Sequence, residues 1–162
     1  IKYFGVSEQL FSVLFGVNVI CLMLANFINS RLVTRYGSLR MLRAGLAVAL
    51  ISAVLLCIFN FLGLNIWFSV FSIAPLMGGL TLISTNTDAL IIMKFPHNSG
   101  TATAVTGTLR FGSGAFAGPL LAYFYTGTAM PFSLLMLSGV LGVIACQLWY
   151  AFNEKKLTPL HS

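Results

Sequence analysis

Long stretches of this chain carry no charged side chain. No Asp, Glu, Lys or Arg lies between Arg43 and Asp88, or between Arg110 and Glu154. A membrane-spanning helix needs about 20 predominantly apolar residues, because a rise of ~1.5 Å per residue must cover a hydrocarbon core of about 30 Å. Each charge-free stretch is therefore long enough for two such helices and the turn that joins them. The pattern predicts an integral membrane protein.

Five helical spans account for the whole pattern. The predicted spans are residues 8–33, 39–62, 66–93, 99–125 and 131–152. We therefore expect one all-α transmembrane domain over residues 1–162, with uncharged turns at residues 63–65 and 126–128. Ser99 is expected to cap the fourth span, and Pro131 suits the first turn of the fifth span.

Composition supports a membrane protein and excludes several other classes. Hydrophobic residues make up 58% of the chain, charged residues make up 7%, and the mean hydropathy is +0.94. This balance excludes a soluble domain. The net charge of +6 comes from basic residues at span ends, so we expect no nucleic-acid partner. The three cysteines lie inside apolar spans at no metal-ligand spacing, and we expect neither a metal nor a cofactor.

Basic residues gather at alternate ends of the predicted spans. They are Arg31, Arg35, Arg40 and Arg43 around the first turn, Lys94 after the third span, and Lys155 and Lys156 in the tail. Cytoplasmic ends of membrane helices are enriched in Lys and Arg, so these ends and the C-terminus are predicted to be cytoplasmic. The N-terminal end, where Lys2 is the only base, is then expected outside.

Arg110 is the first candidate for a functional role. It lies eleven residues beyond Ser99, or ~16 Å into the membrane at helical rise, where an arginine costs about 2.5–3.5 kcal/mol. Thr106 and Ser113 fall on the same side of the predicted helix. This polar stripe predicts a side that lines a substrate cavity. The alternative is a structural arginine that bonds carbonyl groups where two helices cross.

Asp88 is the only acid in the interior of a predicted span, six residues before Lys94. A carboxyl group in a poorly hydrated cavity can carry protons or balance a charge, so Asp88 is a candidate proton or charge site. The alternative is an acid near the interface that reaches water or pairs with a basic loop residue. The estimated depths of Asp88 and Arg110 differ by several ångströms, and the sequence leaves open whether these two residues meet.

Asparagines in the first span form a second candidate group. Asn18 and Asn29 fall on one side of the predicted helix, with Asn26 somewhat off it. Asn18 is expected to line the same cavity as Arg110, and Asn29 to lie nearer the cytoplasmic end. The alternative is that these asparagines only bridge neighbouring helices.

The basic turn NSRLVTRYGSLR, residues 29–40, resembles a loop of major facilitator transporters. In that family a short cytoplasmic loop after the second helix of each half carries an Asp-Arg-x-Gly core that helps latch the cytoplasmic gate. Arg35 and Gly37 match this core, whereas Thr34 replaces the acid and Ser30 replaces the leading glycine. The resemblance implies a gate loop that includes Asn29, Arg31, Arg35, Gly37 and Arg40.

A second segment, FPHNSGTATAVTGTLRFGSG at residues 95–114, resembles the bicyclomycin and chloramphenicol resistance subfamily. There a Phe-Pro-His turn feeds a Gly-Thr-Ala helix, the eleventh of the fold. The order and spacing of all five spans agree, so the resemblance implies that they correspond to helices 8 to 12. It also implies that Gly114, Gly118 and Pro119 echo an antiporter signature, which we interpret first as a site of helix packing and kinking.

The same resemblance implies a function for the whole protein. Two six-helix halves would rock around a central cavity in the bacterial inner membrane and exchange protons for small amphipathic drugs by alternating access. The chain would be the C-terminal half of such a drug and proton antiporter. Its partners would be the lipid bilayer, the drugs, protons and the missing N-terminal half.

Two other classes fit the sequence less well. A non-transporting helical subunit of a larger complex would pair Arg110 with an acid of a partner, but the basic turn and the Phe-Pro-His turn argue against it. An intramembrane enzyme is also disfavoured. The Gly-Ser-Gly at residues 112–114 superficially resembles a serine protease, yet His97 and His161 lie outside the spans and no catalytic motif accompanies it. We therefore do not expect an enzyme.

Overall fold

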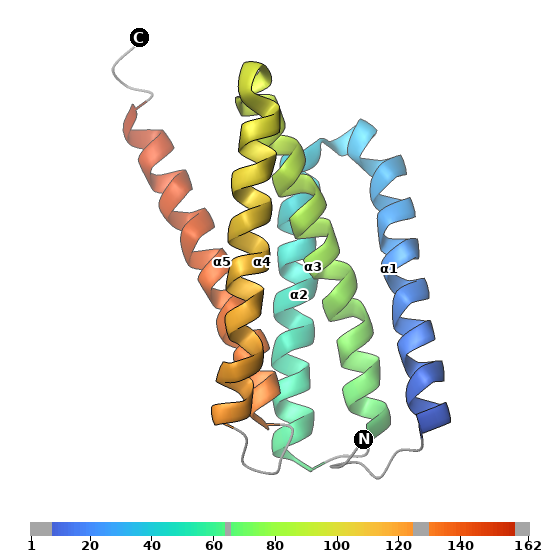
Figure 1. Ribbon diagram of the computed structural model, residues 1–162. Coiled ribbons are helices and arrows are strands. Elements are labelled where there is room, and N and C mark those ends of the chain that lie inside the picture. The colour runs from blue at the N-terminus through green and yellow to red at the C-terminus, as the bar shows by residue number, and fades with distance from the viewer. Residues whose placement is uncertain (1–7, 64–65, 125–129, 158–162) are drawn as a thin grey trace.

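Five long helices and one short 3₁₀ turn make up the computed structural model, which describes residues 8–63, 66–124 and 130–157 (Figure 1). They are α1 (Glu8–Tyr36), α2 (Ser38–Phe61), α3 (Ile66–Lys94), η1 (Pro96–Asn98), α4 (Ser99–Tyr123) and α5 (Met130–Leu157). The helices run alternately up and down, and the predicted all-α fold is confirmed. The described ranges contain no strand.

Four of the helices are long and apolar enough to cross a membrane. The apolar parts are Ser12–Tyr36, Ser38–Phe61, Trp67–Lys94 and Met130–Asn153. The helix α4 is not among them, because its many Thr, Ser and Gly residues and Arg110 lower its hydropathy. It nevertheless lies alongside the others over a similar length (Figure 1). The fourth predicted span is thus a helix of the bundle with a more polar composition than the others.

The corner between α1 and α2 corrects the prediction of a turn over residues 29–40. The helix α1 continues through Tyr36, and α2 already begins at Ser38. Gly37 alone reverses the chain, with a φ of 80° and its N–H donating to the carbonyl of Val33 at 2.8 Å. A glycine adopts this positive φ without a steric penalty, so one residue suffices. The first span was therefore predicted to end too early.

The start of α4 corrects a second prediction. Asn98 rather than Ser99 is the N-cap residue, and its side chain makes no capping hydrogen bond. Ser99 already has helical dihedral angles, φ −57° and ψ −38°, because the 3₁₀ turn η1 leads directly into the helix. Its carbonyl accepts a hydrogen bond from the Thr103 hydroxyl at 2.8 Å. A residue inside the helix cannot act as its cap.

The predicted turns fall largely outside the described residues. The turn at residues 63–65 starts at Gly63, which has a φ of 62° and follows the last residues of α2. Residues 64 and 65 and the predicted turn at 126–128 lie outside the part of the chain that the structure describes, as does Lys2. The side chains of Lys155 and Lys156 are also outside it, although both residues belong to α5.

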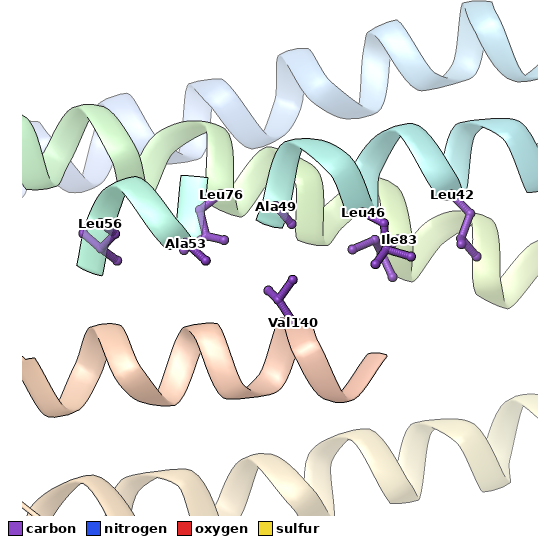
Figure 2. Close-up of a cluster of buried hydrophobic side chains, with 8 residues drawn as sticks. All are labelled: Leu42, Leu46, Ala49, Ala53, Leu56, Leu76, Ile83 and Val140. Carbon is purple, nitrogen blue, oxygen red and sulfur yellow. The ribbon is translucent and has the colours of Figure 1, made fainter. Parts of the chain in front are cut away.

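The core lies between α2, α3 and α5. Its buried side chains face one another in Figure 2: Leu42, Leu46, Ala49, Ala53 and Leu56 from α2, Leu76 and Ile83 from α3, and Val140 from α5. The helices α2 and α3 pack most extensively, because two glycines let their backbones approach. A Cβ on Gly45 would lie 2.9 Å from the carbonyl oxygen of Gly79, and a Cβ on Gly79 would lie 2.8 Å from that of Gly45.

The small residues of α4 have open space around them among the described residues. A Cβ built on Gly114 or Gly118 meets no other side chain or helix within 4 Å among the described residues, and α4 has no buried residue. The close helix approach is at Gly45 and Gly79 instead. Pro119 lies within α4, as predicted, and the helix continues past it to Tyr123. The role of this motif in helix packing and kinking therefore stays a prediction.

Candidate functional site

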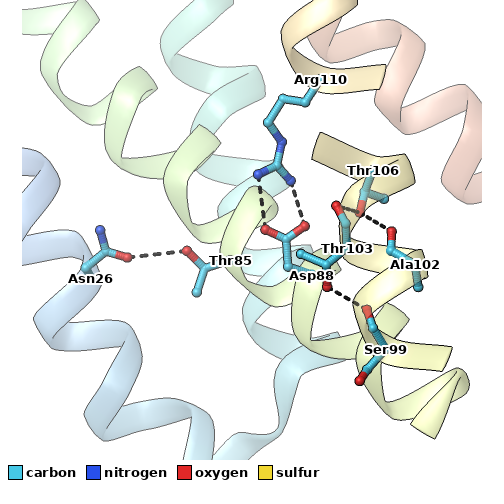
Figure 3. Close-up of polar contacts among 8 residues, drawn as sticks. All are labelled: Asn26, Thr85, Asp88, Ser99, Ala102, Thr103, Thr106 and Arg110. Atoms are coloured by element: carbon cyan, nitrogen blue, oxygen red, sulfur yellow. Dashed lines mark hydrogen bonds and ion pairs between the residues drawn. The ribbon is translucent and has the colours of Figure 1, made fainter. Parts of the chain in front are cut away.

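An ion pair joins α3 to α4. The Nη2 atom of Arg110 donates to Oδ1 of Asp88 at 2.7 Å, and Nη1 donates to Oδ2 at 3.1 Å. Figure 3 shows the guanidinium and carboxylate groups aligned with two parallel bonds. This two-point geometry fixes the orientation of both groups and is stronger than a neutral hydrogen bond. The question that the sequence left open is thereby answered, because Asp88 and Arg110 meet.

Helix direction explains why residues of different depth can pair. The helices α3 and α4 run in opposite directions (Figure 1). Side chains on a helix tilt toward its N-terminus. Asp88 therefore leans away from the end that carries Lys94, while Arg110 leans toward that end. The two tilts bring the charged groups together and close a gap of several ångströms along the helix axes.

The pair lies on an open side of the bundle. The side chains of Arg110 and Asp88 are 48% and 39% exposed. Charges inside a membrane are costly in contact with hydrocarbon, and they almost always face protein or a water-filled cavity. We infer from this cost that the open side of α3 and α4 contacts water or further protein.

A polar band extends from the ion pair to α1. We define the polar band as Asn26, Thr85, Asp88 and Arg110, which are drawn together in Figure 3. Thr85 lies one turn before Asp88 on α3, and its hydroxyl donates to Oδ1 of Asn26 on α1 at 3.4 Å. The band thus crosses three helices, with α3 in the middle. On α1, Asn26 is the residue that belongs to the polar band, although the helical period had placed it somewhat off the side of Asn18 and Asn29.

A buried asparagine pair lies beside the band. Asn86 Nδ2 donates to Oδ1 of Asn29 at 2.9 Å and to the carbonyl of Leu82 at 2.8 Å. The two asparagines are only 1% and 4% exposed, so Asn29 bridges α1 to α3 and is not part of an open loop. Sequence reasoning missed Asn86. The available signal was an asparagine within an apolar span, since such residues often bond across helices.

The other predicted cavity residues do not reach the ion pair. The Thr106 hydroxyl donates to the carbonyl of Ala102 at 2.6 Å, and the Ser113 hydroxyl donates to the carbonyl of Arg110 at 3.0 Å. Both hydroxyls are thus satisfied within α4. Asn18 lies on α1, and its Oδ1 atom is buried without a hydrogen-bond partner among the described residues. These three residues remain predictions as cavity-lining groups.

The predicted gate residues lie at the basic end of the bundle. The Cζ atom of Arg31 lies 5.4 Å from the centroid of the Phe27 ring, and the Cζ atom of Arg35 lies 5.8 Å from the centroid of the Tyr36 ring. Both arginines belong to the last turns of α1, where a cation is favourable to the helix dipole. Arg40 lies in the first turn of α2. Their role in a gate stays a prediction.

Removing the Asn29 side chain should weaken the contact between α1 and α3. We expect Asn29→Ala to lower the free energy of unfolding by about 1 kcal/mol, because interhelical hydrogen bonds in membranes are worth ~0.6–2 kcal/mol. Asn60→Ala is the matched control, since among the described residues the Asn60 amide bonds only to the Leu56 carbonyl of its own helix. Thermal unfolding of the full-length protein measures both. An equal loss of stability in the two variants would contradict the assignment of Asn29 as a bridge between α1 and α3.

No metal site accompanies the pair in the described ranges. No group of three or more His, Cys, Asp or Glu residues there is arranged to hold a metal ion. The chemistry available at the polar band is therefore that of one carboxylate, one guanidinium, and neutral amide and hydroxyl groups. Such groups can bind a polar ligand, exchange a proton at the Asp88 carboxylate, or change partners when the helices move.

Comparison with known proteins identifies relatives along nearly the whole chain. The family model of the Major Facilitator Superfamily matches residues 1–161. The chain is 32% identical over 157 residues to a "Bicyclomycin resistance protein homolog" of Haemophilus influenzae, an alignment that covers 97% of this chain and 39% of the relative. It is also 30% identical over 143 residues to the "Uncharacterized MFS-type transporter YdgK" of Bacillus subtilis, covering 88% of this chain and 35% of the relative.

The chain thus spans well under half the length of the curated relatives that it matches. No solved structure matches it significantly. The two relatives are described as a resistance protein homologue and a transporter, and neither description is that of an enzyme.

Proposed function

Because this chain belongs to the Major Facilitator Superfamily, we propose that it forms the C-terminal half of a drug efflux transporter, with α1 to α5 as its helices 8 to 12. The relative named for bicyclomycin resistance supports drugs as the substrates. The share of that relative that is covered, 39%, supports a larger protein with a further half. The Phe-Pro-His turn at residues 95–97 and the Gly-rich α4 agree with this subfamily.

Alternating access is the proposed mechanism. Two halves of the protein rock around a central cavity, which opens in turn to each side of the membrane. The open side of α1, α3 and α4 faces that cavity and the other half. Large apolar side chains beside the polar band, Met23 at 68% exposed and Phe111 at 80% exposed, give an amphipathic drug an apolar surface to contact. A bilayer-facing role for this side would leave the ion pair in hydrocarbon.

The ion pair between Asp88 and Arg110 is the observation that carries the proposal. Its two bonds link α3 to α4 only while the carboxyl group is ionised. A proton that binds to Asp88 neutralises the carboxylate, removes the ionic attraction and frees the guanidinium for another partner. Loss of that proton restores the pair. Asp88 is therefore our candidate for proton exchange, and Arg110 is the group whose position that exchange controls.

The proposed orientation of the helix bundle across the membrane rests on the end that carries most of its basic residues. We propose that the end carrying Arg31, Arg35, Arg40 and Arg43 faces the cytoplasm of a bacterial cell, across its inner membrane. The last turns of α5 lie at the same end, and the start of α1 lies at the opposite, outer end (Figure 1). Drugs would then leave from the end that carries these arginines toward the outer end, while protons move inward.

The function is tested with the full-length protein in a bacterium that lacks its major efflux pumps. Cells that express it should accumulate less bicyclomycin and less of a fluorescent amphipathic dye than cells with an empty vector. Collapse of the proton gradient by a protonophore should abolish the difference. Equal accumulation in both strains, at verified expression in the membrane, would reject drug efflux. If efflux continued in the presence of the protonophore, proton coupling would be rejected, but drug efflux would not.

A further inference from the structure

A pocket lies at the basic end of the bundle, apart from the polar band. Its volume is about 690 Å³, and it sits where the end of α1, the start of α2 and the last turns of α3 meet. Its lining includes Arg35, Tyr36, Ser38, Arg40, Leu90 and Met93. Two arginines and several apolar side chains thus share one cavity. None of its lining residues belongs to the polar band.

The two arginines carry uncompensated charge. The only acidic side chain that the structure describes, Asp88, is bonded to Arg110. Within the same residues, neither Arg35 nor Arg40 forms a salt bridge, and both are exposed. Arg31 and Arg43 lie nearby on the same helices and add to the positive field without lining the pocket. The pocket therefore favours an anion.

The position of the apolar residues decides between kinds of anion. Leu90 and Met93 belong to the last two turns of α3, which ends at Lys94, and Met93 is 72% exposed. Leu90 and Met93 form an apolar wall in the same pocket as the two arginines. A free inorganic anion, or a carboxylate from another part of the protein, would use the arginines and leave the apolar wall uncovered. An amphipathic anion uses both.

We propose that this pocket binds an anionic phospholipid of the cytoplasmic leaflet. Its phosphate lies between Arg35 and Arg40, and the first part of an acyl chain lies against Leu90 and Met93. Basic pockets between membrane helices on the cytoplasmic side are suited to such headgroups. This lipid site does not depend on which substrate the protein transports. A negative result in the drug-efflux assay would therefore not count against it.

The test measures lipid retention by the full-length protein, purified in mild detergent, using native mass spectrometry. Phosphatidylglycerol and phosphatidylcholine with the same acyl chains are the probes. We expect the wild-type protein to retain phosphatidylglycerol preferentially and R35Q/R40Q to bind it about thirtyfold less tightly, as two lost arginine contacts imply. R31Q/R43Q is the matched control, because it removes the same charge from outside the pocket, and it should retain most of the binding.

Two further measurements distinguish binding of a phospholipid from binding of a free phosphate. Met93→Trp fills the apolar wall and keeps every charge, so it should also weaken phosphatidylglycerol binding if the acyl chain occupies the pocket. Excess inorganic phosphate should leave the lipid bound. Equal losses in the two double variants, displacement by phosphate, or equal retention of the two lipids by the wild-type protein would each overturn the assignment. Each variant is compared at equal thermal stability, so that misfolding is not counted as lost binding.

Discussion

Replacement of Arg110 by alanine in the full-length protein is expected to lower the proposed drug efflux at least about tenfold. Hydrogen bonds to a charged group contribute ~1.5–3 kcal/mol, and ~1.4 kcal/mol corresponds to a factor of ten. The alanine variant loses both bonds between α3 and α4 and leaves the Asp88 carboxylate without its partner. We use the lower end of this range, because the pair is nearly half exposed and water screens it.

Two variants on α4 make this test specific. Arg110→Lys keeps the charge but cannot form both bonds of the guanidinium, so its efflux should lie between the wild type and alanine. Thr108→Ala is the matched control, since the Thr108 hydroxyl bonds only to the Ala104 carbonyl of its own helix within the part of the chain that the structure describes. It should transport normally. Drug accumulation is measured at equal abundance in the membrane. Unchanged efflux by Arg110→Ala under these conditions would show that Arg110 does not take part in transport.

Substitution of Gly45 by valine is expected to have the largest effect on folding. A Cβ at this position would lie 2.8 Å from the Cβ of Leu82, 2.9 Å from the carbonyl oxygen of Gly79 and 3.2 Å from the amide nitrogen of Ile83. Two of these atoms belong to the backbone of α3, which cannot move aside without separating the helices. Overpacking of a tight core costs about 1–3 kcal/mol and occasionally more. The fraction of folded protein and its thermal unfolding temperature should both fall.

Gly142→Val on α5 is the control for this experiment. A Cβ there meets nothing within 4 Å among the described residues, so the same change of side chain has room. Its unfolding temperature should stay close to that of the wild type. If both glycine variants lost the same stability, the cause would be common to both positions, and the close approach of α2 and α3 would not explain the loss at Gly45.

The helices themselves follow from the sequence, because bilayer thickness fixes how long a charge-free stretch must be. The predicted spans therefore locate all five helices, each end to within about five residues. The ends were harder to predict. Gly37 reverses the chain in one residue, and no hydrophobic pattern distinguishes a helix that continues to Tyr36 from a basic loop.

Pairs of residues on different helices could not be derived from periodicity. A helical period assigns a residue to a side and a depth, but it does not say which helix lies opposite. Asp88 and Arg110 meet because α3 and α4 are antiparallel neighbours, which the depth estimate ignored. The same limit explains why Gly45 and Gly79 were not identified as the close approach, while Gly114 and Gly118, which match a known motif, have no neighbour in the described bundle.

The central claim is that Asp88 and Arg110 act as one unit in transport. A double-mutant cycle of Asp88→Asn, Arg110→Gln and the combined variant tests it most directly, with the rate of proton-driven drug efflux as the readout. If the pair is the functional unit, each single variant loses efflux and the double variant is no worse than the single variants. If the two losses multiply, each residue acts separately, and the ion pair is not the element that carries transport.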